Sequence, residues 1–77
     1  MAHSKNIIVK RGDYGSHVVE IQKALNKAGF WPAYVPFSKN FGSTTDKYVR
    51  KFQEANSLVT DGKVGESTIS KLGIDIT

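Results

Sequence analysis

The sequence contains no cysteine among its 77 residues. Disulfide bonds therefore cannot hold the chain together, and a zinc site built on thiolates is excluded. No apolar run approaches the roughly 20 residues that a membrane-spanning helix requires, and the polar N-terminus lacks the apolar core of a signal peptide. A chain of this length buries only about 60% of the surface of its unfolded state. We therefore expect one small domain that depends on its hydrophobic core alone.

Residues that catalyse reactions are also scarce. The two histidines, His3 and His17, do not make a zinc site without a third histidine or a fixed acid, and His17 is expected to face solvent. No Ser/His/Asp set, nucleophile elbow or phosphate loop is present. Asp61 and Glu66 are typical of a turn residue and a first-turn helix acid. The sequence predicts no catalytic residue, no metal site, no cofactor and no enzymatic activity.

Basic residues outnumber acidic ones by 11 to 7, which gives a net charge of +4. They occur singly or in pairs, such as Lys10-Arg11 and Arg50-Lys51, whereas nucleic-acid-binding surfaces usually cluster them. We expect no nucleic-acid partner and no membrane insertion. A small basic helical DNA-binding domain stays open as an alternative. It is disfavoured because about nine residues separate the second and third expected helices, too many for a helix-turn-helix.

Apolar residues at helical spacing predict a first helix from Ser16 to about Ala28. A glycine, Gly29, follows it, as is typical just past a helix end. The residues expected on its buried face are Val18, Ile21, Leu25 and Ala28.

A second helix is expected from Ser43 to about Asn56. Ser43 predicts an N-cap, because its hydroxyl can accept from backbone N–H groups of the first turn, and Asp46 follows at the spacing of a capping box. The residues expected on its buried face are Thr45, Val49 and Phe52. A third, shorter helix is expected from Glu66 to about Leu72.

Residues 30–41 contain both prolines and five of the eight aromatic residues, so a long structured loop is expected there. The aromatic residues of the loop are Phe30, Trp31, Tyr34, Phe37 and Phe41. The three phenylalanines are expected to cover the core. Trp31 and Tyr34 suit the core and a wet edge equally well, because their rings are apolar and their tips polar.

The expected helices repeat a pattern. Val18, Ile21, Gln22 and Ala24 correspond to Val49, Phe52, Gln53 and Ala55, and each helix start carries Gly-x-x-(Val/Thr). Repeats of this kind build a shared core from one small unit. The two glutamines are expected to bond loop backbone, because a buried amide needs partners. The sequence therefore predicts an all-α fold, a compact three-helix bundle with an internal repeat and a long aromatic and proline-containing loop between helices one and two.

Several motifs occur in order along most of the chain. They are Val9 to Phe30, Phe41-Gly-Ser-Thr-Thr45, Tyr48-Val-Arg-Lys-Phe-Gln53 and Leu58 to Thr68. With them the chain resembles the three-helix peptidoglycan-binding domain (peptidoglycan-binding domain 1), which is found beside catalytic domains in phage endolysins and bacterial cell-wall hydrolases. The resemblance covers about residues 8–73, which leaves residues 1–7 as a flexible N-terminal segment and 74–77 as a tail. The structural motif residues that it implies are Gly15, Gln22, Gly42, Thr45, Gln53, Asp61, Gly62, Gly65 and Thr68.

One segment departs from the family pattern. The family usually has Asp-Gly-x-Phe-Gly before its second helix, and this chain has a similar run, 61–65, before its third. Before the second helix the corresponding residues are Ser38-Lys-Asn-Phe-Gly42. The acid and the first glycine of the pattern are absent there, and a lysine is present.

The resemblance implies a non-catalytic module that binds peptidoglycan, through glycan or stem peptide, and anchors a linked hydrolase domain. We expect a monomer that acts at the cell wall, outside the cytoplasm or delivered by a phage. Aromatic faces stack on sugars, and amides and cations bind hydroxyl, acetamido and carboxylate groups. The candidate groove residues are Trp31, Tyr34, Lys39, Asn40 and Tyr48. A protein–protein adaptor that reuses the fold is the alternative, although the pro-regions of matrix metalloproteinases, which share it, depend on a cysteine that is absent here.

Overall fold

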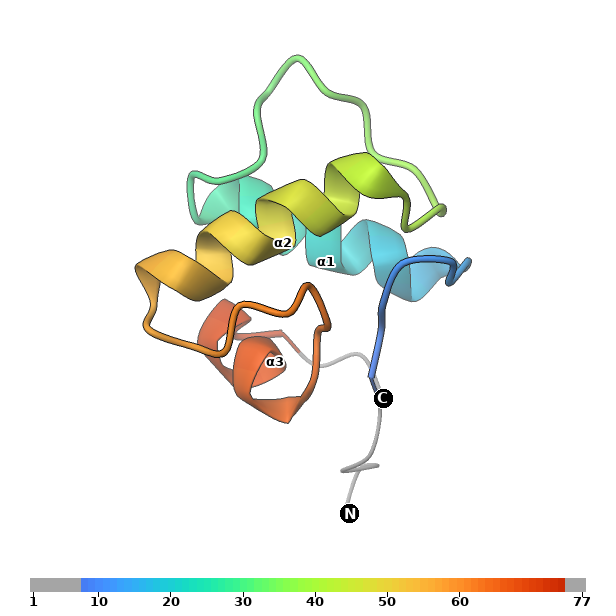
Figure 1. Cartoon of the computed structure of the whole chain (residues 1–77). Helices are drawn as coiled ribbons and strands as arrows, with labels where there is room; N and C mark the ends of the chain where they lie inside the picture. The colour runs from blue at the N-terminus through green and yellow to red at the C-terminus, as the bar shows by residue number, and fades with distance from the viewer. Residues whose placement is uncertain (1–7, 75–77) are drawn as a thin grey trace.

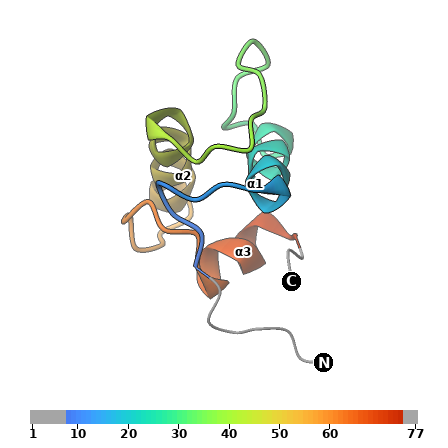
Figure 2. The ribbon, with the colours of Figure 1, turned by 90° about the vertical axis from the view of Figure 1, so that its right-hand side faces the viewer.

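The computed structural model describes residues 8–74, and the N-terminal segment 1–7 and residues 75–77 lie outside this range. Three helices follow one another, α1 (Ser16–Lys27), α2 (Ser43–Ala55) and α3 (Glu66–Leu72). The helices α1 and α2 lie side by side, and α3 lies beneath both of them (Figures 1 and 2). The all-α three-helix prediction is confirmed, with each helix boundary within one residue of its expected place.

The helices α1 and α2 both run from right to left in Figure 1, as the colour gradient shows, and they cross at an angle. A short turn can only join antiparallel neighbours, so the connection between them must return along a helix roughly 18 Å long. Residues 28–42 make this return without forming a helix or a strand. The direction of the two helices thus explains the length of the loop.

The core forms where α1 and α2 face each other and the connecting segments close over them. Its members are Val9, Val18, Ile21, Leu25, Trp31, Phe41, Val49, Phe52 and Val64. Phe30 packs edge-on against Phe52, with ring centroids 5.3 Å apart, while Phe37 remains 41% exposed. Ala28 was expected to be buried, but it lies just beyond the end of α1 and is exposed. Ile74, expected in the tail, packs against the core.

The predicted cap of α2 is wrong. Gly42 occupies the N-cap position, Ser43 is the first helical residue, and no side chain caps the helix. Asp46 instead pairs with Arg50 one turn later, at 3.1 Å from its Nε. An acid and a base four residues apart lie on the same side of a helix. Asp46 therefore pairs with the positive charge of Arg50. The first-turn N–H groups of α2 receive no side-chain acceptor.

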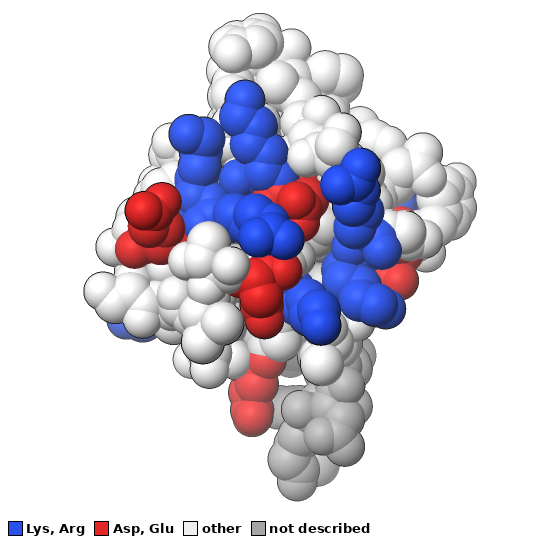
Figure 3. Space-filling view, in the orientation of Figure 1, with Lys and Arg blue, Asp and Glu red and all other residues white. Residues whose placement is uncertain are grey.

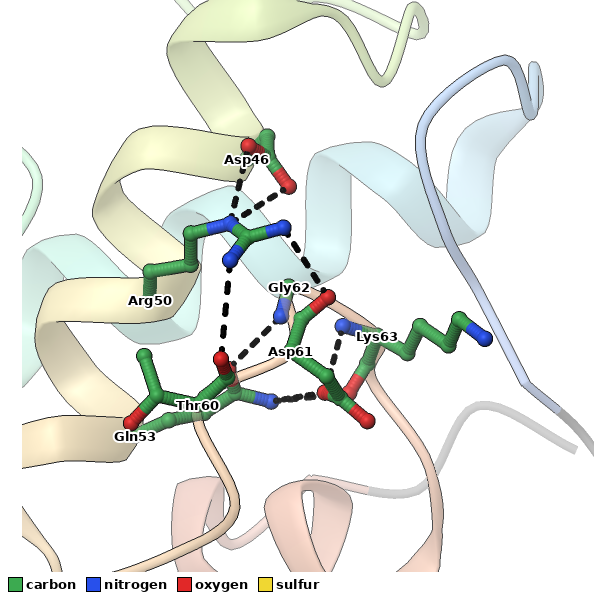
Figure 4. Close-up of polar contacts among 7 residues, drawn as sticks. All are labelled: Asp46, Arg50, Gln53, Thr60, Asp61, Gly62 and Lys63. Atoms are coloured by element: carbon green, nitrogen blue, oxygen red, sulfur yellow. Dashed lines mark hydrogen bonds and ion pairs between the residues drawn. The ribbon is translucent and has the colours of Figure 1, made fainter.

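The Asp46–Arg50 pair fixes the loop before α3. Lys and Arg side chains crowd this face (Figure 3), yet within residues 8–74 this is the only ion pair. Arg50 also donates to the backbone carbonyls of Thr60, at 3.5 Å, and Asp61, at 3.2 Å (Figure 4). Gly62 has a φ of +75°, and a Cβ there would overlap Asp46 Oδ1. The loop can approach α2 this closely because residue 62 has no side chain.

A buried glutamine joins α2 to the same loop. Gln53 Nε2 donates to the carbonyl of Lys63 at 2.8 Å, to Thr68 Oγ1 at 3.1 Å and to Asp61 Oδ1 at 3.2 Å. Its Oε1 accepts from the N–H of Gly62 at 3.0 Å (Figure 4). The amide therefore connects α2, the loop and the first turn of α3. The prediction that Gln53 bonds loop backbone is confirmed.

Gln22 on α1 makes a similar set of bonds to the loop before α2. Its Nε2 donates to Thr45 Oγ1 at 2.9 Å and, at 3.5 Å, to the carbonyl of Asn40. Its Oε1 accepts from the N–H of Ser38 at 2.7 Å. Ser38 Oγ accepts from the N–H two residues on, at Asn40, just as Asp61 Oδ1 accepts from Lys63. A serine thus makes the bond that an acid makes in the other loop.

The segment before α1 joins both loops. Val9 and Val64 exchange two backbone hydrogen bonds, of 3.0 and 2.7 Å. The N–H of Gly12 donates to the carbonyl of Phe41 at 2.9 Å, and an isolated bridge pairs Tyr14 with Asn40. The blue segment accordingly crosses between the two loops in Figure 2. The segment from Val9 to Tyr14 is therefore part of the domain.

We predict that Gln53→Ala lowers the free energy of unfolding by about 2–4 kcal/mol, because loop N–H and carbonyl groups lose their partner inside the protein. Urea unfolding followed by circular dichroism measures the change. The exposed neighbour Glu54 supplies the control Glu54→Ala, expected within about 0.5 kcal/mol of the parent. Equal stabilities of the two variants would contradict the bridging role.

We predict that Gly62→Ala destabilises the domain by about 2 kcal/mol more than Gly73→Ala, because only the first adds a clash to the strain of positive φ. The two glycines have nearly the same φ, +75° and +74°, and a Cβ at Gly73 would meet nothing within 4 Å. Chemical unfolding of both variants separates the two effects. If both substitutions have the same cost, the close approach of Asp46 is not what requires a glycine.

Candidate functional site

Trp31, the first predicted groove residue, is only 4% exposed. Its indole N–H donates to the carbonyl of Val35 at 2.9 Å, within its own loop. The ring packs against Tyr48, with centroids 5.5 Å apart, and lies 6.2 Å from Phe37. The polar tip of Trp31 thus has a partner inside the protein and its ring supports the loop from below, which favours the core over the wet edge among the two places that the sequence left open. Its candidate role in a groove stays a prediction.

The other four predicted residues lie on the surface or partly covered. Tyr34 is 85% exposed in the loop, and Tyr48 is half-buried against Trp31, with Lys47 Nζ 5.4 Å from its ring centroid. Lys39 is exposed, and its carbonyl accepts from the N–H of Gly15 at 3.0 Å. Asn40 is exposed as well. Its side-chain amide makes no hydrogen bond to any residue from 8 to 74.

A hollow of about 300 Å³, the α2 hollow, lies between the long loop and the start of α2. Its lining residues are Gln22, Trp31, Val35, Pro36, Ser38, Asn40, Gly42, Ser43, Thr44 and Thr45. The structure thus brings Trp31 and Asn40 to one hollow, whereas the lining does not include Tyr34, Lys39 or Tyr48. No charged side chain lines it, and amide, hydroxyl and backbone N–H groups alternate with apolar surface.

A second hollow, the α3 hollow of about 390 Å³, lies at the start of α3. Its lining residues are Gln53, Ser57, Leu58, Val59, Asp61, Lys63, Gly65, Glu66, Ser67 and Thr68. Gln53 and Thr68 take the places that Gln22 and Thr45 take in the α2 hollow. The candidate site residues chosen from the sequence did not include this hollow, although the repeated glutamine was the signal for it. The α3 hollow differs by its charged residues, Asp61, Lys63 and Glu66.

The described part of the chain offers little for metal or membrane chemistry. Among residues 8–74 no group of three or more His, Cys, Asp or Glu side chains lies close enough to hold a metal ion. None of the helices in that range is both long and apolar enough to cross a membrane. The two hollows described above instead offer hydrogen-bonding groups among apolar surface.

Comparison with known protein families identifies one match. The model of a family described as a putative peptidoglycan-binding domain matches residues 14–72, which is most of the chain. The match includes all three helices and both loops that line the hollows.

Several solved structures share this fold. A peptidoglycan-binding protein from Clostridioides difficile, in complex with glutamine hydroxamate, is 32% identical with a TM-score of 0.80, and the match covers 92% of this chain and 43% of that protein. The endolysin of Burkholderia phage AP3 is 35% identical, with a TM-score of 0.77 and coverage of 86% and 24%. The N-terminal domain of SleB is 36% identical, with a TM-score of 0.79 and coverage of 94% of both chains. The chain therefore spans less than half of the first two proteins.

We predict that Trp31→Ala lowers the free energy of unfolding by about 3–5 kcal/mol, because it empties a buried site. Tyr34→Ala, which removes a side chain that is 85% exposed, should change it by less than about 0.5 kcal/mol. Urea unfolding followed by far-UV circular dichroism measures both variants. A folded Trp31→Ala variant of unchanged stability would show that the indole does not support the loop.

Proposed function

Since this chain belongs to the peptidoglycan-binding domain family, we propose that it is a non-catalytic module that holds a linked lytic or wall-remodelling enzyme on the bacterial cell wall. Two of the similar structures belong to proteins more than twice as long as the matched region, one of them a phage endolysin. A domain that binds the wall raises the local concentration of substrate around an attached enzyme. The module acts as a monomer at the wall, after export or phage delivery.

The α2 hollow is the binding site in this proposal. The observation that carries it is a lining without charged residues, in which hydrogen-bonding groups lie within a larger apolar surface, beside a helix start whose N–H groups receive no side-chain cap from residues 8–74. The free amide of Asn40 and the hydroxyls of Ser43 and Thr44 supply further donors and acceptors. Such groups complement the hydroxyl and acetamido groups of a wall sugar.

The ligand of this hollow is then the glycan of peptidoglycan and not the stem peptide. No cation lines the α2 hollow, so a carboxylate of a stem peptide would find only the N–H groups at the start of α2, which a sugar hydroxyl or acetamido oxygen can also use. Lys39, the cation offered for that role by the sequence, is not part of the lining. The apolar surface of Val35 and Pro36 in the lining suits the apolar face of a sugar ring. Tyr34 and Tyr48 extend the site beyond the hollow as candidate contacts for adjoining sugar units.

The two hollows provide a matched pair of variants for testing the site. Thr44 is the second residue of α2 and Ser67 the second residue of α3, and both are exposed and line their respective hollows. We predict that Thr44→Gln, which fills the α2 hollow without changing charge, weakens pelleting with purified sacculi about tenfold, the effect of losing roughly 1.4 kcal/mol. Ser67→Gln should bind like the parent chain.

The opposite pattern would move the site to the α3 hollow and overturn its assignment to the α2 hollow. Failure of the parent chain to pellet with sacculi at any salt concentration would overturn the proposed function itself. Proton–nitrogen NMR with soluble glycan fragments that lack stem peptides tests the ligand. Shifts centred on Asn40 and Thr44 are expected, and their absence with such fragments but presence with stem-bearing ones would assign the stem peptide instead.

A further inference from the structure

A charged cleft of about 220 Å³ lies where the segment before α1, the helix α2 and the loop before α3 meet. Its charged lining residues are Lys10, Arg11, Arg50, Lys63, Asp46 and Asp61. Four bases and two acids give this lining a net charge of +2, half the net charge of the chain. Figure 3 shows Lys and Arg side chains gathered on this face around a few acidic ones.

The two acids of the cleft already have partners. Both carboxylate oxygens of Asp46 accept from Arg50 Nε, at 3.1 and 3.3 Å. Asp61 Oδ1 accepts from the N–H of Lys63 at 2.9 Å and from Gln53 Nε2 at 3.2 Å. The guanidinium of Arg50 is equally engaged, with the acid and with loop carbonyls (Figure 4). These three side chains hold the loop in place.

The other three bases have no acidic partner in the part of the chain that the structure describes. No carboxylate lies within 4.0 Å of the side chains of Lys10, Arg11 or Lys63 in that range. Their positions are nevertheless set by the backbone. Lys10 and Arg11 lie between two residues that backbone hydrogen bonds hold in place. Val9 pairs with Val64 in the loop before α3, and Gly12 donates to Phe41 in the loop before α2. The fold therefore collects unpaired cations at one cleft.

We propose that this cleft binds a phosphodiester polyanion, a linear wall polymer with one negative charge in each repeating unit. A cleft lined by charge of one sign attracts the opposite charge and focuses it. The lining contains no aromatic residue, so a sugar ring finds no stacking partner there. The site is separate from the α2 hollow, whose lining shares none of its residues.

The origin of the three bases favours a polymer over a single carboxylate. They come from the segment before α1 and from the loop before α3. A chain of phosphates carries its charges at intervals, so successive phosphates can contact all three bases. Lysine binds phosphate as a point charge. The choice of a wall polymer rests on the proposed function, whereas binding of a polyphosphodiester does not. Duplex DNA carries the same charge and serves as the competing ligand in the test.

The test is a titration of the chain with soluble poly(glycerol phosphate), followed by proton–nitrogen NMR at low and high salt. Shifts at Lys10, Arg11 and Lys63 are expected, and they should fall as salt rises. Replacing these three bases by glutamine should weaken binding about tenfold, since exposed charge contacts contribute up to about fivefold each.

A control variant changes the charge by the same amount elsewhere. Lys23, Lys27 and Lys71 are exposed and do not line the cleft, and their triple replacement by glutamine should weaken binding less than about twofold, because only long-range attraction is lost. Circular dichroism of both triple variants checks that the fold is intact. Equal losses in the two variants would overturn the cleft as the site.

Two further outcomes would also overturn the proposal. One is tighter binding of a duplex DNA of equal charge, and the other is displacement of the polymer by an isolated stem peptide at lower concentration. Sacculi freed of phosphodiester polymers keep this test distinct from that of the proposed function. If the chain pellets with them but ignores poly(glycerol phosphate), the cleft proposal fails while the wall-binding module stands. If the chain binds the polymer but does not pellet with these sacculi, the cleft proposal stands while the wall-binding module fails.

Discussion

The arrangement of the domain depends on two buried side-chain amides. The loops before α2 and α3 place backbone N–H and carbonyl groups beside the core, in buried or part-buried positions where they need partners. Gln22 and Gln53 form hydrogen bonds with those groups. Each also bonds a threonine in the first turn of the next helix. In residues 8–74 no buried side-chain nitrogen or oxygen is left without a partner. A fully satisfied polar network of this kind specifies one arrangement of a small core.

The two glutamine networks are similar in bonding but differ in charge. Ser38 bonds the N–H two residues on, as Asp61 does in the other loop, so replacement of the acid leaves the turn intact. The change removes a carboxylate from the α2 hollow, whereas the α3 hollow retains one. Two halves with the same local scaffold therefore present one neutral surface and one charged surface. Charge is therefore what distinguishes the two hollows.

Sequence patterns predicted the helices well because periodic burial of apolar residues dominates their formation. They also predicted that the glutamines bond loop backbone. The cap at Ser43 failed, because a local capping pattern does not reveal that Asp46 meets Arg50. Trp31 was ambiguous, since only the path of the loop shows that its N–H reaches Val35. The charged cleft escaped notice because its residues come from three separate segments, and the groove assignment itself stays a prediction.

The pairing of Val9 with Val64 has a consequence for how the domain is assembled during synthesis. The first of these residues leaves the ribosome long before the second, so Val9 lacks this backbone partner until almost the whole domain has been made, whereas Gly12 can already bond to Phe41. Contacts between residues so distant in sequence close late, because the intervening chain must first be ordered. A chain arrested before residue 64 could form α1 and α2. It would lack the backbone hydrogen bonds that hold Val9 in place.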